Sequence, residues 1–427
     1  MPPTELNETR LNPANPWHPS TAPGDKAAEA KDSPGRFREL DALRGIAALI
    51  VVLFHCWMTV HLSTNMLAAH LQAGDSFWAD PENWFRFTPL RVITAGPASV
   101  GLFFTLSGFV LALPWARGRP QGYLEFLTRR FFRLYVPFAV AIGCAALLCQ
   151  FSHPTPIASL GAWFNDSWNE PLGAQLIAAH LFMLGTRADM SLDNVMWSLV
   201  HEARISLIFP FLIVATLARP VWVLAASIAL FAVLSTQGVF GWIAAELIGP
   251  GRLWGIATML DSLRYGIYFV VGLLVALHRA RLTALLAGLG GLWRGLLWLV
   301  AAALLLTRFG AYSDASWAAG AALLIVLTLA APGARRALCQ GPLLWLGRVS
   351  YSLYLVHVPI ILGVVHAGYG RVPIAALLAT AFALSLLLAE LFNRAVEQPS
   401  QKLGQKVGSR SSRHATRTFI AKRIDPG

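Results

Sequence analysis

The segment LRGIAALIVVLFHCW, residues 43–57, carries an arginine and a histidine in an otherwise apolar run. Arg44 and His55 are eleven positions apart, which on an α-helix is three turns plus about 20°. Both side chains therefore share one helix face, about 16 Å apart along the axis, and Asp41 lies one turn before Arg44. Histidine titrates near neutral pH and can act as a general base or as a covalent acyl carrier. The spacing predicts a polar path that leads to a reactive histidine.

A ligand with phosphates at one end and a reactive group at the other would match this path. Acetyl-coenzyme A has that shape, because an extended pantetheine arm separates its phosphates from its thioester. The alternative is structural: His55 is a packed, hydrogen-bonded histidine, and Arg44 is an ordinary cationic residue at the cytosolic end of a membrane helix. The spacing alone supports both interpretations equally.

Other ionisable residues lie within apolar segments, where they are costly and usually functional. Glu202 is a candidate to pair with His55 and hold its tautomer, as a carboxylate does in a triad. It could instead bind acceptor hydroxyls or form a structural ion pair. Arg130 and Arg133 are one turn apart at a cytosolic helix start, and they could clamp phosphates. Cytosolic positive charge that only sets the membrane orientation is the alternative for these two arginines.

Polar residues on two further segments are candidates for the acceptor side. Ser350, Tyr354 and His357 follow an i, i+4, i+7 pattern and share one helix face. They could shape an acceptor cavity or form helix–helix hydrogen bonds. Ser107 lies in the segment LSGFV, where a serine and a glycine favour close helix packing over direct substrate contact.

The elements that position these residues are membrane helices. Of the 427 residues, 56% are hydrophobic and only 13% are charged, whereas soluble domains carry about 25% charged residues. Apolar runs recur that approach the roughly 20 residues needed to cross a bilayer as a helix. The sequence predicts an all-α integral membrane protein of about ten transmembrane helices. Their expected ranges are 44–62, 97–115, 134–151, 195–217, 221–239, 263–279, 283–304, 314–332, 343–365 and 373–392. Several glycines interrupt the seventh range, and a start near Gly295 is the alternative.

The net charge of +12 is best explained by membrane topology and does not indicate nucleic-acid binding. With both termini in the cytoplasm, about 26 of the 34 Lys and Arg residues fall on the inner side. Residues 1–35 are expected to form a disordered cytosolic tail, 36–400 the transmembrane domain and 401–427 a basic cytosolic tail. The two long outer segments, roughly 63–96 and 152–194, are rich in Trp, Asn, Asp and Pro, as expected for lids or glycan-contacting surfaces. Interfacial anchoring by aromatic residues is the alternative. The four cysteines lack metal-binding spacing, and no metal site is expected.

Six motifs together resemble the acyltransferase family 3 membrane proteins, in the correct order over roughly residues 36–400. They are RELDALRGIAALIVVLFH, SVGLFFTLSGFVLA, RRFFRLYVPF, VMWSLVHEARISLIFP, LGRVSYSLYLVHVPI and VEQP. The resemblance implies transfer of an acyl group, usually acetyl, from acyl-coenzyme A to a hydroxyl, commonly of a cell-envelope sugar. It also implies that the family's catalytic His is His55 and its paired Arg is Arg44. The chain departs from the family at Ile205 and Ser206, where an aromatic pair is common.

The sequence thus predicts a multi-pass O-acyltransferase of the bacterial inner membrane. It would use acetyl-coenzyme A as donor and a carbohydrate as acceptor, with no bound cofactor; the oligomeric state is not predicted. The alternative is a transporter of a glycolipid or an acylated small molecule. The predicted roles are catalysis for His55, Arg44 and Glu202, donor binding for Arg44, Arg130 and Arg133, and acceptor binding for Ser107, Tyr354 and His357.

Overall fold

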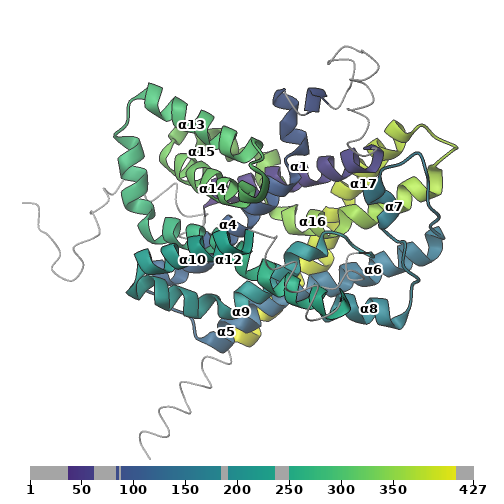
Figure 1. Cartoon of the computed structure of the whole chain (residues 1–427), viewed down its shortest axis with the longest axis horizontal. Coiled ribbons are helices and arrows are strands. Elements are labelled where there is room, and N and C mark those ends of the chain that lie inside the picture. The colour runs from purple at the N-terminus through teal and green to yellow at the C-terminus, as the bar shows by residue number, and fades with distance from the viewer. Residues whose placement is uncertain (1–36, 62–82, 86–87, 184–190, 236–249, 410–427) are drawn as a thin grey trace, which may run out of the picture. The chain divides into compact units, whose positions relative to one another are not determined.

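The computed structural model describes residues 37–61, 83–85, 88–183, 191–235 and 250–409. From Arg38 onward the chain forms one compact unit, in which every described element is helical (Figure 1). The expected tails, 1–35 and the end of 401–427, lie outside the described residues, as does most of the first long outer segment.

Eight helices in the described part of the chain are long and apolar enough to cross a membrane. They are α1 (Arg38–Val60), α4 (Gly96–Ala116), the continuous helix of α5 (Tyr123–Arg130) and α6 (Val136–Ser152), α9 (Met196–Ala218), α12 (Pro250–Ala287), α14 (Ser313–Ala330), α16 (Gly341–Gly368) and α17 (Ile374–Phe392) with its extension to Ser409. Two shorter apolar helices, α10 (Pro220–Ser235) and α13 (Gly291–Leu306), match the remaining two expected spans. The protein is an all-α integral membrane protein.

The seventh span begins at Gly291, which lies between the expected start at residue 283 and the alternative start near Gly295. Helix α12 continues through Ala287, and α13 begins only at Gly291. Gly288 and Gly290 break the helix, because glycine is the weakest helix former after proline. Gly290 has extended backbone angles (φ −61°, ψ 160°) at the start of α13.

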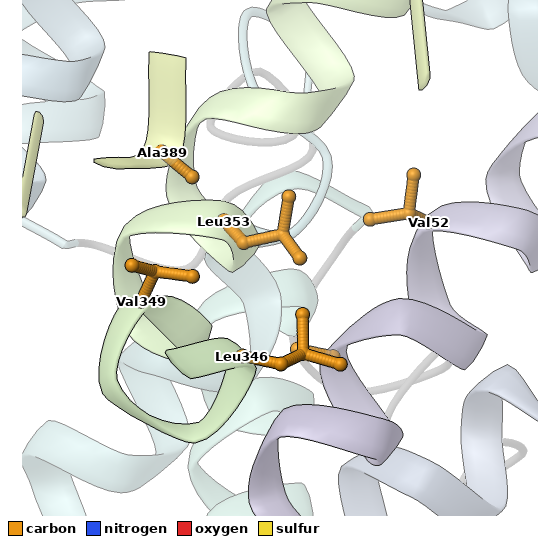
Figure 2. Packing of buried hydrophobic residues seen from close by; sticks show 6 residues of the cluster. Val52, Leu346, Val349, Leu353 and Ala389 are labelled. Carbon is orange, nitrogen blue, oxygen red and sulfur yellow. The ribbon is translucent and has the colours of Figure 1, made fainter. Parts of the chain in front are cut away.

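Helices α1 and α16 cross in direct backbone contact. A Cβ atom placed on Gly45 would lie 2.5 Å from the Gly347 nitrogen, so a side chain at either glycine would force the helices apart. Small residues at such a crossing allow the close packing that holds helices together in lipid. Figure 2 shows the cluster beside the crossing, where Val52 of α1 faces Leu346 and Leu353 of α16, with Ala389 of α17 nearby.

Two π-helical turns interrupt the helices on the expected cytosolic side. One, Phe131–Tyr135, joins α5 to α6, and the other, Asn393–Glu397, follows α17. The hydroxyl of Ser400, which follows the second turn, donates a hydrogen bond to the Phe132 carbonyl in the first turn. The last helix then continues through Ser409, beyond the boundary expected at Ser400. π-Helical turns within α-helices are frequently found at functional sites.

Short helices on the expected outer side pack against the ends of the spans. They are η3 (Pro89–Thr94), α7 (Ala162–Asp166), α8 (Ala174–Leu181) and η6 (Gly310–Tyr312), while α15 (Pro332–Leu338) lies at the opposite end. Helix α7 is fixed to the end of α1, because the Gly161 N–H donates to the Thr59 carbonyl at 2.8 Å. A Cβ atom on Gly161 would collide with the Met58 carbonyl, which explains glycine at this contact.

Candidate active site

The α1–α16 pair brings two histidines into direct contact. The Nδ1 atom of His55 lies 2.9 Å from the Nε2 atom of His357. Both rings are buried, with 7% of His55 and none of His357 exposed. His357 was predicted as an acceptor-side residue, and no pattern in the sequence indicated that it would contact His55.

The hydrogen bonds of His357 determine the tautomer of His55. The Nδ1 atom of His357 lies 3.0 Å from the Leu353 carbonyl, which can only accept, so this nitrogen carries a proton. In a neutral His357 the Nε2 atom is then an acceptor, and His55 must donate to it through Nδ1–H. The Nε2 atom of His55 is left with a lone pair, which is the form that a general base needs.

An aromatic side chain of the outer segment covers His55. The indole of Trp163, on α7, stacks on the His55 ring with 4.8 Å between centroids and 25° between planes. Its Nε1 atom is buried and has no hydrogen-bond partner among the described residues. The composition of segment 152–194 left a lid, a glycan-contacting surface and interfacial anchoring open, and no spacing identified Trp163 as the residue over the histidine.

Arg44 lies on the predicted face of α1 and is held by three groups. Its Nε donates to the Ser350 hydroxyl at 3.0 Å, and its Nη2 donates to Asp41 at 3.2 Å and to the Gly347 carbonyl at 3.4 Å. Ser350 and His357, on one face of α16, therefore contact the two ends of the predicted polar path.

Glu202 pairs with Arg130, and the suggested pairing with His55 is wrong. The Arg130 Nη2 atom is 2.6 Å from Glu202 Oε1, which also accepts a hydrogen bond from Ser107 at 2.9 Å. Arg130 also donates to Ser206, at 2.9 Å from Nη2. His55 forms its hydrogen bond with His357, whereas Glu202 forms an ion pair with the Arg130 guanidinium, which is always charged. The structure thus places Ser107 against the ion pair of Glu202 and Arg130.

Arg133 completes a group of three arginines on the expected cytosolic side. It lies within electrostatic range of the like charges Arg44 and Arg130, and of the carboxylates Glu202 and Glu397. Among the described residues it forms no hydrogen bond or ion pair. A guanidinium that is repelled by two neighbours and lacks a partner would gain from an anionic ligand such as a phosphate.

Tyr354 lies on the histidine side of the site. Its hydroxyl is 2.6 Å from the Ser198 hydroxyl, and its ring centroid is 6.0 Å from that of His357. Of the three predicted acceptor residues, His357 contacts His55 and Tyr354 lies beside His357, while Ser107 donates its hydrogen bond to Glu202.

Asp193 is a further residue of the site region that the sequence did not single out. It precedes α9, is 1% exposed, and lies within electrostatic range of Tyr354. Neither carboxylate oxygen has a hydrogen-bond partner of good geometry among the described residues. Burial raises the pKa of Asp193 to about 8, and the nearby Val195 backbone amide offsets only part of that cost. Aspartate is common shortly before a helix, where it caps the first turn, so its position in the sequence did not mark Asp193 as a buried residue.

Comparison with known proteins decides the family. The family model described as an acyltransferase domain matches residues 37–390. The chain belongs to acyltransferase family 3. It is 27% identical to the acyltransferase MdmB of Streptomyces mycarofaciens over 394 residues, which cover 86% of this chain and 92% of the relative. It is also 25% identical to the O-acetyltransferase PaAT-1 of Phomopsis amygdali, over 41% of this chain and 40% of the relative. No solved structure shows a significant match to the chain. The resemblance found in the six motifs is confirmed, and the protein is a membrane acyltransferase.

Proposed function

We propose that this acyltransferase moves an acetyl group from acetyl-coenzyme A to a hydroxyl of a cell-envelope carbohydrate, in a bacterial inner membrane. The observation that carries the proposal is the His55–His357 hydrogen bond. It leaves an unprotonated nitrogen on a histidine that shares a helix face with Arg44. The family and the printed name of the O-acetyltransferase relative support the same reaction class.

The donor would enter from the arginine side. Arg44 and Arg133 would bind its phosphates, since arginine recognises phosphate oxygens through paired, charge-assisted hydrogen bonds. Arg130 contributes positive charge, but its own guanidinium is engaged by Glu202 and Ser206. The pantetheine arm would then run along α1, so that the thioester reaches His55. Arg44 and His55 are separated by about 16 Å of helix.

His55 would act as the general base. Its Nε2 takes the proton of the acceptor hydroxyl while the hydroxyl oxygen forms a bond to the thioester carbonyl carbon. The carbon–sulfur bond then breaks, and the coenzyme A thiolate leaves and takes the proton from His55. The products are the acetyl ester and free coenzyme A. His357 keeps His55 in the required tautomer throughout, and Trp163 covers the ring on its outer side.

The rival function is a transporter that uses the intramembrane charges as a path for a glycolipid. Purified protein incubated with acetyl-coenzyme A and a mixed envelope-glycan fraction separates the two functions. The proposal predicts release of free coenzyme A thiol that depends on the glycan, and strong loss of that release in Arg44→Ala. A transporter would consume no thioester, and a release rate equal to that without protein would contradict the proposal.

A further inference from the structure

A pocket of about 350 Å³ lies at the outer end of α1, between η3, the end of α13 and the start of α14. We call it the outer pocket. Its walls are mainly aromatic and its polar groups are mainly cationic, and they include Trp57, His61, Phe85, Arg91, Arg308 and Trp317. The mechanism above uses none of these residues.

The aromatic wall of the outer pocket is held in place by its own contacts. The Trp57 ring lies 4.3 Å from the Phe85 ring and stacks on His61 at 5.4 Å, with 26° between the planes. On the other side the Trp317 indole donates to the Thr307 carbonyl at 3.2 Å. Flat apolar rings with polar edges suit the faces of a sugar, and such preformed walls with a few polar groups are typical of ligand sites.

The charge of the outer pocket is positive. Arg91 is anchored by its Nε, which donates to the Leu306 carbonyl and ties η3 to the end of α13. Arg308 is exposed and forms no hydrogen bond or ion pair with the described residues. Among those residues, no Asp or Glu lines the pocket. Arginines are depleted on the outer side of membrane proteins, so two at one outer pocket call for an explanation other than topology.

The outer pocket adjoins the histidine pair. Phe54 lines the pocket, and its ring centroid is 5.4 Å from that of His55. Gly96 leaves the space that Phe54 occupies, since a Cβ atom there would overlap the phenyl ring. The pocket and His55 therefore lie on neighbouring faces of α1, and Phe54 touches both.

We propose that the outer pocket binds the acceptor through an acidic sugar. The aromatic walls would stack on the sugar ring, while Arg308 and Arg91 would bind its carboxylate or phosphate. A neighbouring hydroxyl of the same glycan could then extend past Phe54 toward His55. This inference rests on the proposed function, because it assigns the substrate class of the same reaction.

Binding of a defined saccharide tests the proposal without turnover. The full-length protein, in a neutral detergent that has no sugar headgroup, is titrated calorimetrically with trigalacturonic acid and with its methyl ester. We expect the acid to bind at least about tenfold more tightly at low salt, and the difference to shrink in 1 M salt. Arg308→Gln should remove most of the preference while leaving ester binding unchanged. Arg371→Gln, at an exposed outer arginine away from the pocket, should keep it.

Three results would overturn the proposal: equal affinity for acid and ester, equal loss of the preference in both variants, or displacement of the acid by phosphatidylglycerol in bicelles, which would indicate a lipid headgroup site.

Failure of the proposed function gives a different result from failure of the pocket assignment. If the acid binds as expected but acetyl-coenzyme A is never consumed, the proposed reaction is wrong and the assignment of the pocket to an acidic sugar is kept. If acetyl transfer proceeds equally to acidic and neutral glycans and Arg308→Gln has no effect on it, the assignment of the pocket is wrong and the proposed reaction is kept.

Discussion

At the scale of single residues, the site depends on which nitrogen of each histidine carries a proton. The Leu353 carbonyl fixes the proton on His357, and His357 in turn fixes the proton on His55. This relay gives His357 the orienting role that the sequence-based hypothesis assigned to Glu202. His357 would thus be a positioning residue, acting on the reaction through His55.

Replacement of His357 tests that role. His357→Ala should lower kcat about 100-fold or more, because His55 loses the acceptor that fixes its tautomer. The KM for acetyl-coenzyme A should not change. His357→Gln keeps an acceptor oxygen and should recover part of the rate. His153→Ala, at an exposed histidine after α6, is the control. A role in packing alone would be indicated if the alanine and glutamine variants lost activity equally.

Replacement of Arg133 tests whether this residue binds the donor, acetyl-coenzyme A. Its guanidinium has like-charged neighbours and no hydrogen-bond or ion-pair partner among the described residues, so a bound phosphate would relieve the repulsion. Arg133→Ala should raise the KM for acetyl-coenzyme A about tenfold, equivalent to about 1.4 kcal/mol, with little change in kcat. Arg294→Ala, at the start of α13, should leave the KM unchanged. An unchanged KM in Arg133→Ala would remove this residue from the donor site.

At the scale of elements, the α1–α16 crossing sets the distance between the two histidines. Gly45 and Gly347 let the backbones touch, so the crossing also places Ser350 at Arg44 and His357 at His55. A larger side chain at the crossing would separate both pairs together. The close contact is therefore both a packing feature and a requirement of the site.

The variant Gly347→Val tests this dependence. A side chain there would meet the Asp41 carbonyl, and overpacking of this kind costs about 1–3 kcal/mol. We expect a lower Tm in detergent and a loss of acyl transfer in the fraction that remains folded. Gly143→Val is the control, because a Cβ atom there meets nothing within 4 Å. Equal melting temperatures for the two variants would contradict the close backbone contact between α1 and α16 at Gly347.

The outer segment gives a pH-dependent prediction through Asp193. Burial raises its pKa from 3.8 to about 8, so the folded state holds a proton that the unfolded chain releases between these values. The part of the free energy of unfolding that depends on the Asp193 proton should therefore be greatest below about pH 4 and should fall as the pH rises toward 8. Asp193→Asn removes the titration, so its Tm advantage over wild type should grow by several degrees between pH 5 and pH 8. Asp166→Asn, on the exposed end of α7, should show no such trend, and a constant difference for Asp193→Asn would contradict the assignment.

At the scale of the whole molecule, the sequence predicted what depends on local pattern. Apolar runs predicted the helices, and the eleven-residue spacing predicted the shared face of Arg44 and His55. Contacts between distant helices were not predictable, because a single sequence does not show which polar side chains meet. For Glu202 the sequence therefore left a pairing with His55, acceptor binding and a structural ion pair open, and the structure shows an ion pair with Arg130. Trp163 was not singled out. Helix edges also shifted where glycines or π-helical turns change the backbone, as at Gly288 and at Phe131–Tyr135.

The topology of the whole chain is open to direct measurement. With both termini inside, the loop before α16 should face the cytoplasm and the loop after α6 should face outward. In a background with the four native cysteines replaced by serine, a membrane-impermeant maleimide should label Thr155→Cys in intact cells, whereas Gln340→Cys should require permeabilised cells. The reverse pattern would invert the orientation of the site and place the arginine cluster on the outer side, away from cytosolic acetyl-coenzyme A.

Acyl transfer should depend on His55, the histidine on α1. Membrane vesicles supplied with acetyl-coenzyme A labelled in the acetyl group show this if label is followed into the glycan fraction for wild type and His55→Ala at matched protein level. We expect transfer by wild type and none above background by His55→Ala. Transfer by His55→Ala at the wild-type rate would show that the histidine is structural and that it does not take part in the reaction.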